Sequence, residues 1–173
     1  MSNLMQVIRA RRSTRAFRSE LPPREQVMQL VEAAEWAPSG RGLFLWHFTV
    51  IYNAEKSLRL ARAVADADNR GPEYNFYGAP VNIIISYRRG EHHAFVDGAA
   101  AMENILLAAT DLGLGSCWIN QLRETCDEPA VRALLTEYGV PEDHIVIGSA
   151  AIGYIEKETP AKPRKEGVVS IVD

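Results

Sequence analysis

Arginines gather near the start of the chain at a density that could bind an anion. Arg9, Arg11, Arg12, Arg15 and Arg18 fall within ten residues. A guanidinium group can bind phosphate or carboxylate oxygens through two parallel hydrogen bonds, so a cluster of them suits a phosphate. A charge run of this kind is also typical of a solvated helix face. The arginines alone leave both interpretations open.

The residue types that most often carry catalysis are sparse or wrongly spaced. None of the four histidines lies four residues from another, as a helical zinc pair would require, and the two cysteines do not form a C-x-x-C motif. Cys117 lies in an apolar segment without a neighbouring base, which is typical of a buried structural cysteine. We therefore predict no metal site and no side-chain nucleophile, and the G-x-S-x-G motif of serine hydrolases is also absent.

Nucleotide-binding motifs are incomplete as well. Gly113-Leu114-Gly115 supplies only the first half of a G-x-G-x-x-G fingerprint, and it lies between a predicted helix and a predicted strand, the reverse of the required order. The phosphate loop G-x-x-x-x-G-K-[ST] is missing. A compact chain without its own nucleophile, metal or acid–base pair often relies on an organic cofactor.

Composition restricts the class of protein. The chain has 173 residues, of which 47% are hydrophobic and 24% charged, which predicts a single domain over residues 1–173. A net charge of -3 argues against a nucleic-acid partner, and no apolar stretch is long enough to span a bilayer. Two cysteines suit a reducing compartment. We expect a cytoplasmic protein that binds neither nucleic acid nor membrane.

Apolar periodicity and β-branched runs predict alternating helices and strands. The predicted helices cover residues 24–36, 54–67, 93–112 and 128–138, and the strands cover 46–52, 81–87, 115–119, 145–154 and 168–172. The helix over 93–112 carries small or apolar residues nearly all round, and such a helix is buried. It could pack against its copy in another subunit or form the centre of a monomer.

Several separated segments together resemble the nitroreductase family of FMN enzymes. Residues 11–17 read RRSTRAF, which matches the family pattern R-R-S-x-R-x-F. The others are AAEWAPSG at 33–40, WHF at 46–48, GLGSCWI at 113–119, the stretch 148–154 and KPRK at 162–165. Their order and approximate spacing agree with the family along nearly the whole chain.

The resemblance implies a fold, a cofactor and a partner. The fold would be α+β, with three α-β-α layers, a central mixed sheet flanked by helices, and the strand over 168–172 exchanged with the partner subunit. The protein would be a homodimer with the helix over 93–112 at its core and FMN at the subunit interface. NADH or NADPH would serve as the transient reductant.

The resemblance also implies which residues bind FMN. The phosphate would be held by Arg11, Arg12, Ser13, Arg15, Arg164 and Lys165. The flavin ring would contact Pro38, Ser39 and Gly40 of the partner subunit and the backbone of Cys117, Trp118, Ile119 and Asn120, with one amide near N5. Asn75 is a candidate for the pyrimidine edge of the ring, or else a plain loop residue. No side chain is nominated as catalytic.

The sequence departs from the family after Ser39-Gly40. Gly42 replaces an amide side chain, and Phe44-Leu45 replaces a Gln-Pro pair, so the pocket beside the ring becomes more apolar. The first functional hypothesis is an oxidoreductase that passes hydride from NAD(P)H through FMN to a small nitroaromatic or quinone by a ping-pong mechanism. The departures motivate an alternative, a flavin-binding storage, sensing or regulatory protein with little turnover. A dimer that has lost flavin is a remoter alternative.

Overall fold

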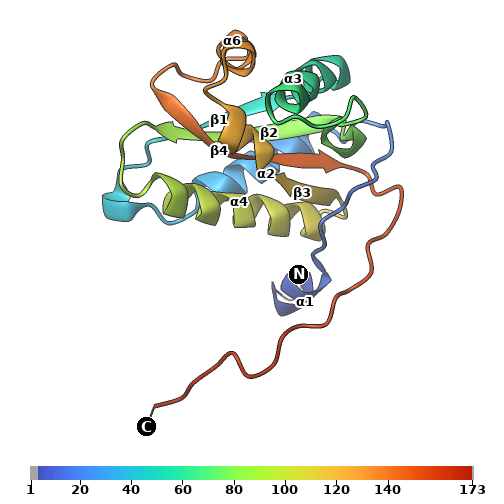
Figure 1. Ribbon diagram of the computed structural model, residues 1–173. Helices are drawn as coiled ribbons and strands as arrows, with labels where there is room; N and C mark the ends of the chain where they lie inside the picture. Colours follow the sequence, from blue (N-terminus) through green and yellow to red (C-terminus); the bar gives the residue numbers. More distant parts are fainter. Residues whose placement is uncertain (1–3, 173) are drawn as a thin grey trace.

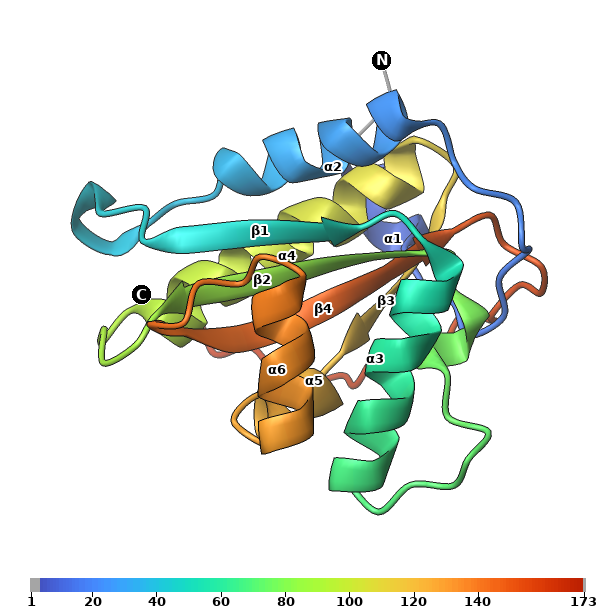
Figure 2. The same ribbon diagram turned by 90° about the horizontal axis from the view of Figure 1, so that it is seen from above.

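A four-stranded sheet lies between two layers of helices in the computed structural model, which describes residues 4–172 (Figures 1 and 2). The strands are β1 (Trp46–Ile51), β2 (Val81–Arg88), β3 (Gly115–Ile119) and β4 (His144–Gly153). The helices are α1 (Leu4–Ala10), α2 (Arg24–Glu35), α3 (Ala54–Ala67), α4 (Ala94–Asp111), α5 (Gln121–Thr125) and α6 (Pro129–Glu137). Two short 3₁₀ turns, η1 (Gly40–Gly42) and η2 (Phe76–Gly78), lie in loops.

The sheet has the strand order β1-β2-β4-β3, and every neighbouring pair is antiparallel. The expectation of a mixed sheet is therefore corrected for these four strands; a parallel pairing occurs in the isolated bridge between Ser13 and Ser116. The connection between β1 and β2 explains why these two strands are antiparallel. After β1, helix α3 leads away from the sheet and the loop over 68–80 leads back to the same end, where Ile51 pairs with Asn82 (Figure 2).

The two faces of the sheet bury separate apolar clusters, which gives the three layers that the resemblance implies. On one face, Ile83 and Ile85 of β2 pack with α2 and α4. On the other face, Ile84 packs with α3, α5 and α6. Successive side chains of a strand point to opposite faces, so a strand covered on both sides must be apolar throughout. This accounts for the Ile83-Ile84-Ile85 run of the central strand.

Helix α4 is buried on one side only within a single chain. Ala101, Met102 and Ile105 face the core, but Phe95 and Val96 are 49% and 69% exposed. The burial on nearly all sides that the sequence predicts is therefore not reached within one chain, although both α1 and α2 contact α4. Phe95 and Val96 therefore form an exposed apolar face on α4.

The C-terminal arm leaves the body of the protein. From residue 156 onward it runs past α1 and extends away from the sheet (Figure 1). Residues 168–172 form no strand within the chain, and Ile171 and Val172 are 82% and 95% exposed. The exchange of this segment with a partner subunit stays a prediction. None of the described helices is long and apolar enough to cross a membrane.

Candidate functional site

A cavity of about 140 Å³ joins the two ends of the chain. We call it the cationic cavity. Its lining residues are Arg11, Arg12, Ser13, Arg15, Thr159, Pro160, Lys162 and Arg164. Five of these side chains are cationic, and none of the described lining residues is acidic. The structure thus gathers most of the residues that the sequence predicts for the phosphate, although they come from opposite ends of the chain.

Three of the basic residues near the ends of the chain do not line the cavity. Arg9 and Arg18 belong to the same run as Arg11 and Arg15, and they are exposed, as a solvated charge run would be. Lys165 follows Arg164 in a segment without helix or strand, and it is exposed. A phosphate contact from Lys165 stays a prediction.

Backbone ties hold the N-terminal wall of the cavity against β3. Ser13 forms the parallel bridge with Ser116, and the backbone N–H of Thr14 donates to the Ser116 carbonyl at 2.9 Å. The Thr159 hydroxyl donates to the Ser13 carbonyl at 3.1 Å, which brings the C-terminal arm to the same place. Gly115 is required here, because a Cβ at that position would lie 2.8 Å from the Thr14 hydroxyl.

The arginines of the cavity are placed by local contacts. Arg12 donates to the carbonyls of Arg9 and Arg11, at 2.6 and 2.7 Å, so part of its guanidinium is used in shaping the loop. Arg11 forms an ion pair with Glu103 of α4 at 3.5 Å. Arg15 lies over the Tyr77 ring at 5.8 Å. These contacts position the guanidinium groups of Arg11, Arg12 and Arg15.

Strand β3 continues from the cationic cavity. Burial raises the pKa of the Cys117 thiol, while the charges of Arg15 and Arg11 act to lower the same pKa. The thiol therefore stays neutral near pH 7, which agrees with the prediction of a buried structural cysteine. The bridge from Ser13, which lines the cavity, to Ser116 places the cavity directly beside β3.

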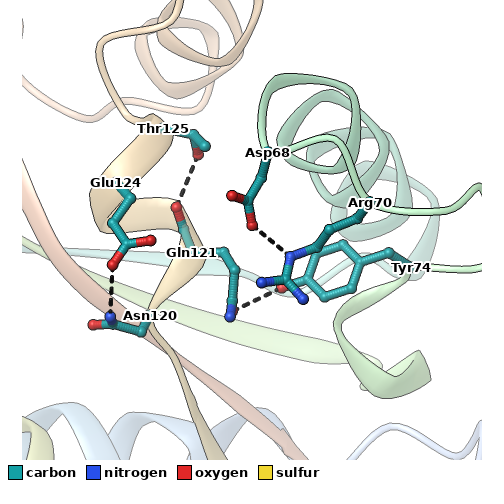
Figure 3. Close-up of polar contacts among 7 residues, drawn as sticks. All are labelled: Asp68, Arg70, Tyr74, Asn120, Gln121, Glu124 and Thr125. Atoms are coloured by element: carbon teal, nitrogen blue, oxygen red, sulfur yellow. Dashed lines mark hydrogen bonds and ion pairs between the residues drawn. The ribbon is translucent and has the colours of Figure 1, made fainter.

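The far end of β3 is tied to the loop over 68–80. The Tyr74 hydroxyl donates to Oε1 of Gln121 at 3.0 Å, and Arg70 lies over the Tyr74 ring at 5.1 Å (Figure 3). Asn120, the last residue of the predicted ring-binding segment, donates to Glu124 at 3.2 Å. Asn75 follows Tyr74 and is exposed. The two segments predicted to meet the flavin ring, 117–120 and Asn75, are therefore connected through Tyr74.

The remaining predicted ring contacts, Pro38, Ser39 and Gly40, lie at the N-terminal end of α4. The Ser39 hydroxyl donates to Oδ2 of Asp97 at 2.8 Å, and the Gly40 N–H donates to Oδ1 and Oδ2 at 3.0 and 3.1 Å. The Tyr87 hydroxyl completes the shell with a 2.8 Å bond to Oδ2. We call this arrangement the Asp97-held turn.

The sequence interpretation missed Asp97 and Tyr87. A signal was available, because a lone carboxylate in the small, apolar first half of a helix must find hydrogen-bond donors if it is buried. Burial by itself raises the pKa of Asp97, but the hydrogen bonds from Gly40, Ser39 and Tyr87 outweigh this effect and hold the pKa below its ordinary value. Asp97 is therefore a buried, ionised acceptor.

The Asp97-held turn and the cationic cavity lie apart within one chain. The turn is next to Asp97 near the start of α4, whereas the cavity is lined by residues of the segment 11–15, which follows α1, and by residues of the arm that follows β4. Arg11 at the cavity forms its ion pair with Glu103, further along α4 than Asp97. Among the described residues of one chain, Ser39 and Gly40 do not line the cavity.

A larger cavity of about 430 Å³ shares Arg12, Thr159 and Pro160 with the cationic cavity. It extends towards Gly113 and Leu114, away from Asn120. Arg12 is its one basic residue among those described, and Glu158 is also in its lining. This space therefore lacks the excess of positive charge that makes the smaller cavity a phosphate candidate.

Comparison with known proteins identifies the family of the chain. The sequence profile of the nitroreductase family matches residues 8–154, which include β1–β4 and most of the residues discussed above. The chain belongs to the nitroreductase family. In this family member, the matched region begins just before the arginine cluster and ends before the C-terminal arm that completes the cationic cavity.

Three relatives of this nitroreductase-family chain illustrate the range of sequence identity. The FMN-bound nitroreductase structure from Bacteroides fragilis NCTC 9343 is 37% identical, covers 100% of both chains and has a TM-score of 0.92. The 4-nitrobenzoate reductase of Nocardioides sp. is 25% identical, covering 89% of this chain and 81% of its own length. The FMN reductase (NADPH) of Bacillus subtilis is 23% identical, and the match covers 95% of this chain and 70% of the length of that protein.

Proposed function

We propose that this family member is an FMN-dependent oxidoreductase that uses NADH or NADPH as its reductant. The observation that carries the proposal is the cationic cavity, where five basic side chains from both ends of the chain surround about 140 Å³ beside β3. A phosphate monoester carries a charge of about −1.5 to −2 at pH 7 and accepts several charge-assisted hydrogen bonds. The names of the B. fragilis and B. subtilis relatives support FMN as the bearer of that phosphate.

The residues around the cavity fit the rest of FMN. Arg11, Arg12, Ser13, Arg15 and Arg164 would hold the phosphate. The backbone of Cys117, Trp118, Ile119 and Asn120 would lie along the ring, with Asn75 at its pyrimidine edge. Bound FMN supplies hydride acceptance and donation at N5, the chemistry for which the chain offers no group of its own.

The chain's part is binding and orientation rather than acid–base catalysis. Cys117 is buried and neutral, and Asp97 is fully engaged in hydrogen bonds, so neither is available to move a proton. The backbone of β3 is rigid because it pairs with β4 from Gly115 to Ile119. A rigid strand holds its N–H groups in fixed directions, which suits a hydrogen bond to one ring atom.

A homodimer follows from the same proposal. The residues of the Asp97-held turn do not line the cavity of their own chain, and α4 exposes Phe95 and Val96. Pairing two copies through α4 would cover these side chains and bring the turn of one chain to the cavity of the other. The extended segment over 168–172 would then pair with the partner's sheet. Residues 1–173 form one domain in this proposal.

The acceptor is proposed to be a small aromatic molecule, either a nitroaromatic compound or a quinone. Phe44 is 54% exposed and lies edge-to-face with Trp46 at 5.6 Å, and Trp118 is 36% exposed. Exposed aromatic side chains of this kind suit a flat apolar ligand. Reductant and acceptor would use one surface in turn, which makes the mechanism ping-pong. The buried, unpaired Cys117 and Cys126 suit work in the cytoplasm.

Absorbance spectra of the purified protein test the proposal. We expect flavin bands that persist after FMN addition and desalting, and that bleach when NADH or NADPH is added without oxygen. Addition of a quinone or 4-nitrobenzoate should then restore the bands. Initial rates at several concentrations of both substrates should give parallel double-reciprocal lines, as ping-pong kinetics require.

Other outcomes would point elsewhere. Flavin bands that persist but do not bleach with either nicotinamide would favour a storage, sensing or regulatory protein. A protein that retains no flavin would overturn the assignment of the cationic cavity. Riboflavin provides the matched control, because it has the same ring and lacks the phosphate; it should bind more weakly than FMN by at least about tenfold, the value of one charge-assisted hydrogen bond.

A further inference from the structure

Asp97 is a buried carboxylate, 3% exposed, and most of its hydrogen bonds come from one short segment. Ser39 and Gly40 provide three of the four bonds to its oxygens, and Tyr87 provides the other. A buried charge needs such partners, because an unpaired carboxylate in the core is costly. The Ser39–Gly40 backbone therefore cannot move away from α4 without leaving the charge unsatisfied.

The same contacts fix the direction of the Ser39 hydroxyl. Its single hydrogen is donated to Asp97 at 2.8 Å, and its oxygen accepts the N–H of Phe44 at 3.0 Å. A serine hydroxyl has one donor and two acceptor positions. Because its hydrogen is donated to Asp97, Ser39 can act towards a further ligand only as an acceptor, and the carboxylate determines this.

The loop that follows needs support of this kind. Arg41, Gly42 and Phe44 have φ values of 60°, 63° and 50°, in the left-handed region. For residues other than glycine this conformation costs on the order of 1 kcal/mol, and it persists where neighbouring contacts enforce it. The bond from the Phe44 N–H to Ser39 is such a contact. Asp97 acts on Phe44 through Ser39.

We propose that Asp97 is a positioning residue for flavin binding: it holds the Ser39–Gly40 turn and the Phe44 loop in shape and sets the Ser39 hydroxyl as a hydrogen-bond acceptor towards the ring. This inference rests on the proposed function, because it assumes that the turn meets a flavin bound by the partner subunit. It assigns Asp97 to the ring end of the ligand and not to the phosphate end.

The test compares the dissociation constant of flavin in the wild-type protein and in the Asp97→Asn variant. Quenching of flavin fluorescence on binding to the full-length protein measures it. Asparagine keeps the shape but replaces one acceptor oxygen with a donor, which conflicts with the donors of Ser39 and Tyr87. We expect the dissociation constant to rise about tenfold or more, the value of one hydrogen bond to a charged group. The rise should be the same for FMN and riboflavin, because only the ring is affected.

Asn104→Ala is the matched control. Asn104 lies two turns further along α4 and donates to the Ala33 carbonyl of α2 at 2.9 Å, so it ties the same helix to a different segment. It should lower the melting temperature and leave both dissociation constants unchanged. Equal losses of flavin affinity in Asn104→Ala and Asp97→Asn would overturn the inference, because general destabilisation would then explain both.

A double-mutant cycle tests whether Asp97 acts through Ser39. Asp97→Asn should weaken flavin binding much less in a Ser39→Ala background than alone. Additive effects would overturn the inference. If Asp97→Asn does not fold, Ser39→Ala is measured alone. Its dissociation constants for FMN and riboflavin should rise by the same factor, and unchanged dissociation constants would overturn the inference. A wild-type protein that binds no flavin would instead refute the proposed function.

Discussion

The cationic cavity and the Asp97-held turn are built in opposite ways. The cavity collects five positive charges from the two ends of the chain, and Arg11 has the one acidic partner identified there, Glu103 at 3.5 Å. The turn has one negative charge, completely surrounded by donors from Ser39, Gly40 and Tyr87. The cavity therefore has positive charge that is not neutralised, whereas the charge of Asp97 is fully satisfied by hydrogen bonds.

This difference shows how each region can contribute to binding. Excess positive charge in an open cavity attracts an anion, and its effect weakens with ionic strength. A satisfied buried network attracts nothing by itself but keeps a backbone turn in one shape, so that less conformational entropy is lost on binding. The phosphate end should therefore supply affinity through charge, and the turn should supply it through preorganisation.

The largest expected effect comes from reversing charge in the cationic cavity. Replacement of both Arg11 and Arg15 by Glu should weaken FMN binding by at least about a hundredfold, since two charge-assisted hydrogen bonds are lost and repulsion is added. Riboflavin binding should change little. Fluorescence titrations at low and high salt would measure both; an equal loss for the two ligands would contradict a phosphate site.

A smaller effect is expected at Gly40, where the turn passes close to α4. A Cβ there would lie 2.5 Å from the His93 ring, so Gly40→Ala must displace either the turn or the ring. We expect a loss of about 1–3 kcal/mol in the free energy of unfolding, as for other overpacked sites. Urea denaturation measures it. His93→Ala in the same chain should restore much of the loss, and failure of this rescue would contradict the proposed contact.

The stabilising contribution of the Asp97-held turn should depend on pH. The pKa of Asp97 is lower in the folded protein than its ordinary value of 3.8, so between these values the unfolded state binds more protons. The contribution of Asp97 is therefore present above the ordinary value and is lost as the pH falls through the folded pKa. The stability gap between wild type and Asp97→Asn, measured by urea denaturation, should narrow below about pH 4. A gap that stays constant with pH would show that the charge is not responsible.

The smallest effect is expected at an ion-pair cluster remote from both regions. Hydrogen bonds from Arg89 and Arg132 lower the pKa of Asp127 to about 2, but the Asp127 side chain is 59% exposed. Surface ion pairs contribute about 0–1 kcal/mol. Asp127→Asn should therefore reduce thermal stability slightly and leave FMN binding unchanged. A large change in the dissociation constant would mean that surface charge in general, and not the cavity, attracts the ligand.

The elements of the fold were largely predictable from local pattern. The helix predicted over 54–67 matches α3, and the strand predicted over 115–119 matches β3. The long helix predicted over 93–112 is α4, which begins and ends one residue inside these limits, and Gly113, at φ 73°, follows its C-terminal end. Direction in the sheet was not predictable, because the loop over 68–80 has no periodicity to show that it returns the chain to the same end.

Within the site, the sequence by itself determined the chemistry available: a cluster of arginines, a second basic group near the end, and no nucleophile or metal ligands. These follow from residue types, which need no coordinates. Only the tertiary structure decided which cations share a cavity, excluding Arg9 and Arg18 from its lining and joining Lys162 to Arg164 beside Ser13. Contact between residues about 150 positions apart depends on the whole path of the chain.

The Asp97-held turn shows the same division more sharply. A serine and a glycine after a helix could be recognised as a family motif, but the carboxylate that holds them is 57 positions away from Gly40 in a helix that otherwise looks like plain core. The small residues of such a helix predict that it is buried, but they do not predict which segments it packs against. The tertiary structure decided which groups bind the carboxylate, because the packing of α4 against β2 and residues 39–40 brings it the N–H and O–H donors that a buried charge requires.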